Sequence, residues 1–75
     1  MHSVATLIGP HAAMFELSVP CEVFGIHRAE IPGWPYRHVV CSPAPETRVG
    51  QGGLTLRAEA SLEALDDADT VVVPP

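Results

Sequence analysis

One carboxylate lies in a segment whose other side chains are mostly apolar, and it is the best candidate for chemistry in this sequence. The segment, residues 14–25, carries its hydrophobic side chains at helical spacing. On a helix that turns about 100° per residue, Glu16 falls inside the apolar arc, between the directions of Val23 and Pro20. Two interpretations remain open. Glu16 is either an ordinary first-turn acid, which the helix dipole stabilises, or a buried acid with a function.

Neither cysteine is expected to act as a nucleophile. Cys21 lies on the apolar arc of the same helix and Cys41 ends a strand, and free cysteine commonly packs as a small hydrophobe. The histidines and cysteines lack zinc-site spacing, which places ligand pairs roughly two to four residues apart. We therefore predict no metal and no cofactor. His38 alternates with Tyr36 and Val40 on one strand face, so it is expected to be a structural histidine.

The elements that position these residues alternate between strand and helix. The predicted elements are a strand over 4–8, a helix over 14–26, strands over 36–41, 47–49 and 54–56, a short helix over 60–65 and a strand over 70–73. Pro20 removes one N–H and should bend the long helix, and Ser61 is the expected N-cap of the short one. Strand, helix and strand within about 40 residues favour a parallel crossover. The sequence predicts an α/β fold with a mainly parallel sheet and a small β excursion around residues 47–56.

Composition limits the classes of function. The chain has 75 residues, a net charge of −5 and only four basic side chains, all arginine. A protein that binds nucleic acid needs a basic surface to contact the phosphates, so any DNA binding is expected from a module outside this segment. No apolar run approaches the ~18 residues of a membrane span, and the beginning lacks the features of a secretory signal. Two cysteines are too few for a disulfide scaffold, so a cytoplasmic location without membrane contact is predicted.

Several motifs of the chain occur together in one known kind of domain. They are the run Phe15-Glu16-Leu17-Ser18-Val19-Pro20-Cys21-Glu22-Val23-Phe24-Gly25, then His27-Arg28-Ala29-Glu30, Trp34, Tyr36, Val40-Cys41, Gly52-Gly53-Leu54 and Ala68-Asp69-Thr70-Val71-Val72-Val73-Pro74. This set resembles the start of a ThiJ/PfpI-type domain of the class I glutamine-amidotransferase-like superfamily. More narrowly, it resembles the copy at the amino end of AraC-type transcription regulators. The match extends over nearly all of this chain but only roughly the first 40% of such a domain, taken at about 150–200 residues.

The resemblance implies a fold and a function. Residues 1–75 would be the incomplete N-terminal portion of a single domain with a flavodoxin-like, doubly wound sheet. The whole domain would sense a small-molecule effector or self-associate, and so govern a helix-turn-helix module further along the chain. A blander alternative is a truncated reading frame without a function of its own.

The resemblance also leaves an enzyme open as an alternative. Glu16 matches the acidic position that, in enzymatic relatives, points at a nucleophilic cysteine, so it would be the catalytic residue of a cysteine-dependent hydratase, glyoxalase or amidase. A desolvated carboxylic acid can keep its proton and hydrogen-bond a thiolate. Two departures from the family pattern count against catalysis. Pro10-His11-Ala12-Ala13 replaces the usual acidic or aromatic residue and glycine, and Pro75 has no N–H with which to hold an oxyanion. The regulator is therefore favoured.

Overall fold

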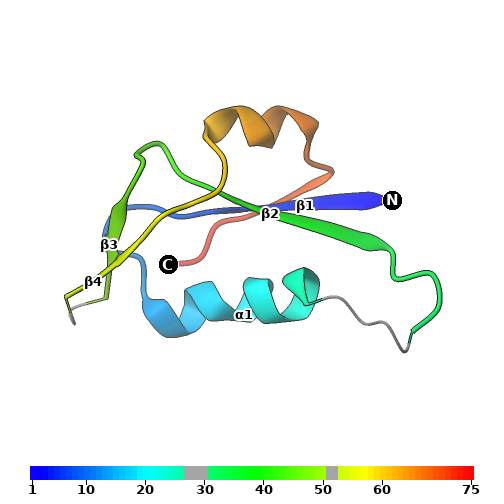
Figure 1. Ribbon diagram of the computed structural model, residues 1–75, viewed down its shortest axis with the longest axis horizontal. Helices are drawn as coiled ribbons and strands as arrows, with labels where there is room; N and C mark the ends of the chain where they lie inside the picture. The colour runs from blue at the N-terminus through cyan, green and yellow to red at the C-terminus, as the bar shows by residue number, and fades with distance from the viewer. Residues whose placement is uncertain (27–30, 51–52) are drawn as a thin grey trace.

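A three-stranded parallel sheet forms the middle layer of the molecule. The computed structural model describes residues 1–26, 31–50 and 53–75; the predictions made for residues 27–30 and 51–52 lie outside the described residues. The sheet contains β1 (His2–Leu7), β2 (Tyr36–Cys41) and β5 (Thr70–Val72) in the order β2-β1-β5. Because β1 has a parallel partner on each side and a helix over each face (Figure 1), Val4 and Ala5, which point to opposite faces, are both buried. The predicted α/β class and the mainly parallel sheet are confirmed.

Two helices lie on opposite sides of this sheet (Figure 1). The α-helix α1 (Met14–Gly25) connects β1 to β2, and the 3-10 helix η1 (Leu62–Asp67) precedes β5. In η1, the Ser61 hydroxyl accepts the backbone N–H of Glu63 at 3.4 Å, which confirms Ser61 as the N-cap. The chain therefore has the strand-helix-strand order that a parallel crossover requires.

The apolar arc of α1 is divided between the protein interior and its surface. Leu17 and Pro20 are buried, and Cys21 and Phe24 are half-buried. The remaining hydrophobic residues of the helix are exposed; they are Met14, Phe15, Val19 and Val23. Pro20 does not end the helix, which continues for five further residues to Gly25. One side of α1 is thus enough to cover the sheet, and the other side stays open.

A small antiparallel hairpin projects from one end of the sheet. Its strands are β3 (Thr47–Val49) and β4 (Leu54–Leu56), which agree with the predicted excursion residue for residue. Gly50 and Gly53 flank the turn with φ of 61° and 69°. This left-handed region costs glycine little and other residues more. The glycines are therefore suited to the hairpin turn, as the sequence predicts.

The amino end of the sheet is closed by contacts that the sequence pattern underestimates. Asp69, just before β5, binds the beginning of β1. Its carboxylate accepts the backbone N–H of Ser3 at 2.8 Å, and its own N–H donates to the Ser3 carbonyl at 2.8 Å. His2 bonds the Thr70 hydroxyl at 2.7 Å. These contacts extend β1 to His2, two residues before the predicted start.

A cluster of aromatic rings lies at the same end. The Tyr36 ring makes edge contacts with Phe24, Trp34 and His2, with centroid separations of 4.9, 5.5 and 5.9 Å. Such T-shaped pairs are favourable because ring edges and faces carry opposite partial charge. Trp34 therefore takes part in local packing.

Candidate functional site

The carboxyl ends of the parallel strands meet the beginning of α1 at one edge of the sheet. In open parallel sheets, ligands bind in the crevice beyond these strand ends. Here the loop after β1 and the segment after β5 come together, because the Ala13 N–H donates to the Pro75 carbonyl at 3.0 Å. The predicted strand over 70–73 ends one residue earlier than expected, and Val73 lies exposed beyond the sheet. This edge is the place to look for a site.

The loop after β1 is fixed to the hairpin by backbone hydrogen bonds. The His11 N–H donates to the Arg48 carbonyl at 3.2 Å, and the Gly50 N–H donates to the Ala12 carbonyl at 2.8 Å. Ala12 and Val49 are buried beneath this junction, where they pack in one core cluster with Ile8 and Leu17. His11 adopts φ of 60°, a left-handed conformation that is uncommon for residues other than glycine, although histidine, asparagine and aspartate adopt it more often than most. The loop and the hairpin thus hold His11 and Arg48 in set positions.

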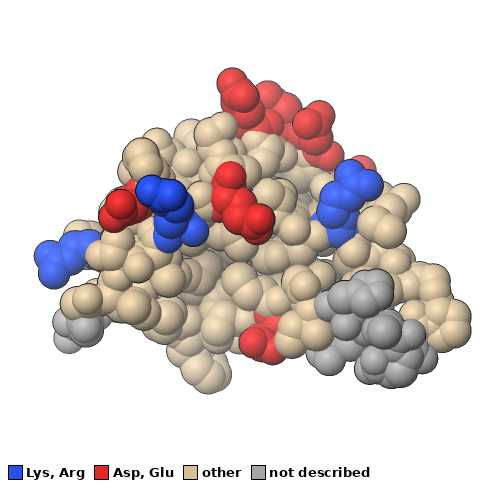
Figure 2. Space-filling model, in the orientation of Figure 1, with Lys and Arg blue, Asp and Glu red and all other residues tan. Residues whose placement is uncertain are grey.

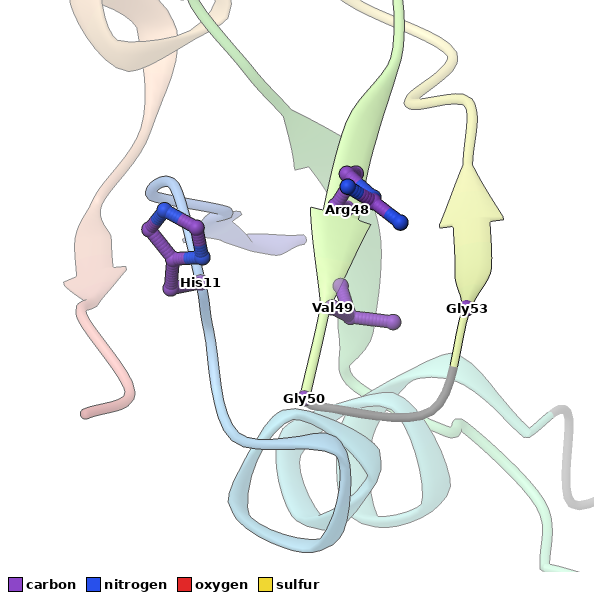
Figure 3. Close-up of a pocket in the computed structure, with 5 residues that line it drawn as sticks. All are labelled: His11, Arg48, Val49, Gly50 and Gly53. Carbon is purple, nitrogen blue, oxygen red and sulfur yellow. The ribbon is translucent and has the colours of Figure 1, made fainter.

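A cavity of about 260 Å³ opens at this junction (Figure 3). Its lining residues are His11, Arg48, Val49, Gly50 and Gly53. Figure 3 shows the His11 ring on the loop after β1 and the Arg48 side chain on β3, with the two glycines at the base of the hairpin turn. The cavity therefore carries a guanidinium group, which is always charged and donates up to five hydrogen bonds.

A second cavity of about 280 Å³ shares two of these residues. It is lined by Ile8, Pro10, His11, Pro43, Ala44, Glu46, Thr47 and Arg48. Its wall is predominantly apolar, in contrast to that of the first cavity, and it follows the carboxyl ends of β1 and β2. His11 and Arg48 thus form a boundary between a polar and an apolar compartment.

Glu16 is placed at the border of the packed side of α1. The side chain is half-buried, so the prediction of a buried acid is met only in part. Its position agrees with the helical arrangement, because Pro20 on one side is buried and Val23 on the other is exposed. Glu16 is not among the described residues that line either cavity. The structure therefore does not bring Glu16 together with His11 and Arg48.

Both cysteines have the properties of packing residues. Cys41 is fully buried at the end of β2, and Cys21 is half-buried on α1. Burial raises the pKa of both thiols, and the neighbouring Glu22 carboxylate raises the pKa of Cys21 further. A nucleophilic cysteine needs the opposite shift, because the thiolate is the reactive form. The expectation that neither thiol is a nucleophile agrees with these environments.

His38 has a structural partner. Its Nε2 lies 2.7 Å from the hydroxyl of Thr6, which is fully buried on β1. Burial lowers the pKa of His38, and the charge of Glu59 opposes this with a smaller effect. The prediction of a satisfied structural histidine is confirmed.

Two further searches of the described residues gave negative results. Within residues 1–26, 31–50 and 53–75, no group of three histidine, cysteine or acidic side chains is arranged to hold a metal ion. In the same part of the chain, no helix is long and apolar enough to cross a membrane.

Sequence reasoning did not single out His11 and Arg48 as a pair. They are far apart in the chain, and only the backbone bonds between the loop and β3 bring them together. The one local signal is that Pro10-His11 stands where the family that the sequence resembles has an acidic or aromatic residue and a glycine, between the first strand and the helix.

Comparison with known proteins adds no assignment. No protein-family model, no curated protein and no solved structure matches this chain.

Proposed function

We propose that this chain is the N-terminal part of a ligand-sensing and self-association domain of an AraC-type transcription regulator. The observation that carries the proposal is the open apolar side of α1, on the helix that bears the regulator-like motifs. Phe15, Val19 and Val23 are 77%, 47% and 48% exposed. They are spaced four residues apart and so form one stripe along the helix. A helix of a self-sufficient domain would present polar residues there.

The stripe is suited to association with a second copy of the same chain. A two-fold interface uses one patch on both subunits, so a patch that contacts itself must be uncharged along its centre. Phe15, Val19 and Val23 meet that requirement. In such a dimer, the stripe of one copy packs against the stripe of the other and removes both from water.

The strand order supports a flavodoxin-like domain. In that fold the first three parallel strands lie in the order 2-1-3. The order β2-β1-β5 is the same once the β3–β4 hairpin is set aside as an excursion. The outer edge of β5 would then receive the next strand of the domain. Val71 on β5 and Val73 beyond it are exposed, as expected of residues that later elements cover.

The charge distribution argues against DNA contact by this segment, so the proposal assigns DNA contact to another module. Acidic side chains gather over η1 (Figure 2), where Glu63, Asp66 and Asp67 are exposed. With a net charge of −5, this surface repels phosphates.

A sensing role fits the two cavities at the carboxyl edge of the sheet, because such edges bind small molecules in open α/β folds.

The enzyme alternative has weaker support from the site. It requires Glu16 to act on a nucleophilic cysteine that would lie beyond residue 75, and Glu16 is not among the described residues that line either cavity. Reading the gene beyond codon 75 separates the alternatives. A basic helix-turn-helix pair after a domain of about 150–200 residues is expected. A cysteine at a strand-to-helix elbow, a following histidine and an early stop would indicate the enzyme. An immediate stop codon would indicate a truncated reading frame.

A further inference from the structure

We infer that the two cavities joined by His11 and Arg48 form one binding site for a small carboxylic acid with an aliphatic tail. The inference rests on the proposed sensing function and names the chemical class of the effector. The carboxylate would lie in the compartment of Arg48, Gly50 and Gly53, and the tail would lie in the neighbouring apolar compartment.

The polar compartment favours an anion. Glu46 is the one carboxylate among the described residues that line either cavity, and it lines only the apolar one. Arg48 therefore supplies the charge of the polar compartment. Its planar guanidinium matches a carboxylate with two parallel hydrogen bonds. His11, whose backbone N–H donates to the Arg48 carbonyl, lines the same cavity.

The apolar compartment favours an unbranched or lightly branched tail. Ile8 is almost fully buried at its base, and Pro10, Pro43 and Ala44 form the exposed part of the wall. These side chains offer carbon surface. Each methylene group that moves from water to this surface should tighten binding by about threefold to fourfold.

The volumes set the size of the ligand. The apolar compartment measures about 280 Å³, which limits the tail, since pockets for whole drug-sized molecules measure about 300–1,000 Å³. A short aliphatic acid such as hexanoate fits this class.

Calorimetric titration of the complete gene product tests the inference. The probes are acetate, butanoate and hexanoate, which differ in tail length, together with neutral hexan-1-ol and cationic hexylammonium. We expect saturable binding of hexanoate at millimolar concentrations, with affinity that falls from hexanoate to butanoate to acetate. Hexan-1-ol and hexylammonium should bind at least about tenfold more weakly, because they lack the charge-assisted bonds to Arg48.

Matched variants assign the binding to the site. Arg48→Gln should weaken hexanoate binding by about tenfold or more. The control is Arg37→Gln, which removes the same charge from an exposed position on β2 outside both cavities. Glu46→Gln should leave hexanoate binding unchanged or tighten it, because it removes a like charge. Circular dichroism of each variant verifies that the fold is retained.

Several results would overturn the inference. If Arg48→Gln and Arg37→Gln weakened hexanoate binding equally, only the net charge of the protein would matter for that binding. Tighter binding of hexylammonium than of hexanoate, lost in Glu46→Gln, would identify a cation as the occupant. Specific DNA binding by the same protein, measured in parallel, separates this test from the proposed function. DNA binding without hexanoate binding refutes the effector class alone, whereas hexanoate binding without DNA binding supports the site and refutes the regulator.

Discussion

The imidazole of His38 and the hydroxyl of Thr6 lie 2.7 Å apart across the paired strands β2 and β1, and this bond joins the two strands beneath α1. Thr6 is fully buried, so its hydroxyl depends on this partner. The hydrogen bond also fixes the orientation of the ring. The Nδ1 atom of that ring faces the end of α1, at 3.1 Å from the place that a Cβ on Gly25 would take.

The lowered pKa of His38 predicts a loss of stability in weak acid. Burial holds this pKa below the ordinary value of 6.5, so the unfolded chain binds more protons between the two values. The free energy of unfolding should therefore be fully retained above pH 6.5 and should decrease as pH falls through the lowered pKa. Urea unfolding of the complete gene product across this range measures the effect. His38→Gln should reduce the slope of the unfolding free energy against pH. An identical slope in both proteins would contradict the assignment of this pH dependence to His38.

Gly25→Ala should destabilise the protein, although alanine ordinarily favours a helix. The added methyl group would meet His38 Nδ1 at 3.1 Å, and the ring cannot move freely while it is bonded to Thr6. Overpacking of this kind costs about 1 kcal/mol or more. The cost should be smaller in a Thr6→Val background, where the ring is released. A double-mutant cycle of unfolding free energies measures the coupling, and strictly additive effects would argue against it.

The sequence predicts the elements better than it predicts the site. The bounds of β2 and of both hairpin strands are correct because each is a β-rich run between turn residues. The beginning of β1 is missed because His2 and Ser3 are polar, and only Asp69 and Thr70 explain why they join the sheet. The division of the apolar arc of α1 could not be predicted, since periodicity identifies apolar residues but not which of them the sheet covers.

The cysteine environments predict slow modification by thiol reagents. Cys41 is fully buried, and burial raises the pKa of both Cys21 and Cys41, so little thiolate is present at neutral pH. Both thiols of the folded protein should react with a disulfide reagent more slowly than free cysteine, and they should reach the free-thiol rate in denaturant. A rate for Cys21 above that of free cysteine would instead identify a reactive thiol and contradict the assignment of Cys21 as a packing residue.

The position of Glu16 predicts different tolerance for two substitutions. Glu16→Gln keeps the size of the half-buried side chain and should change stability by no more than about 0.5 kcal/mol. Glu16→Lys places a positive charge in the first turn of α1, against the helix dipole, and should cost about 1 kcal/mol or more. Thermal unfolding of the two variants measures the difference. Equal stability would place the side chain wholly in solvent and would remove Glu16 from consideration as a functional acid.

The most direct test of the proposed regulator measures how tightly the complete gene product binds duplex sites selected from a random DNA library. The account predicts salt-dependent, sequence-specific binding. It also predicts that Val19→Arg lowers the affinity for DNA by at least about tenfold. That variant places a charge in the stripe through which two copies would associate and so reach two half-sites. Ser18→Arg adds the same charge at an exposed polar position of α1 and should bind like the unaltered protein. Absence of specific binding by the unaltered protein, or equal binding by both variants, would contradict the account.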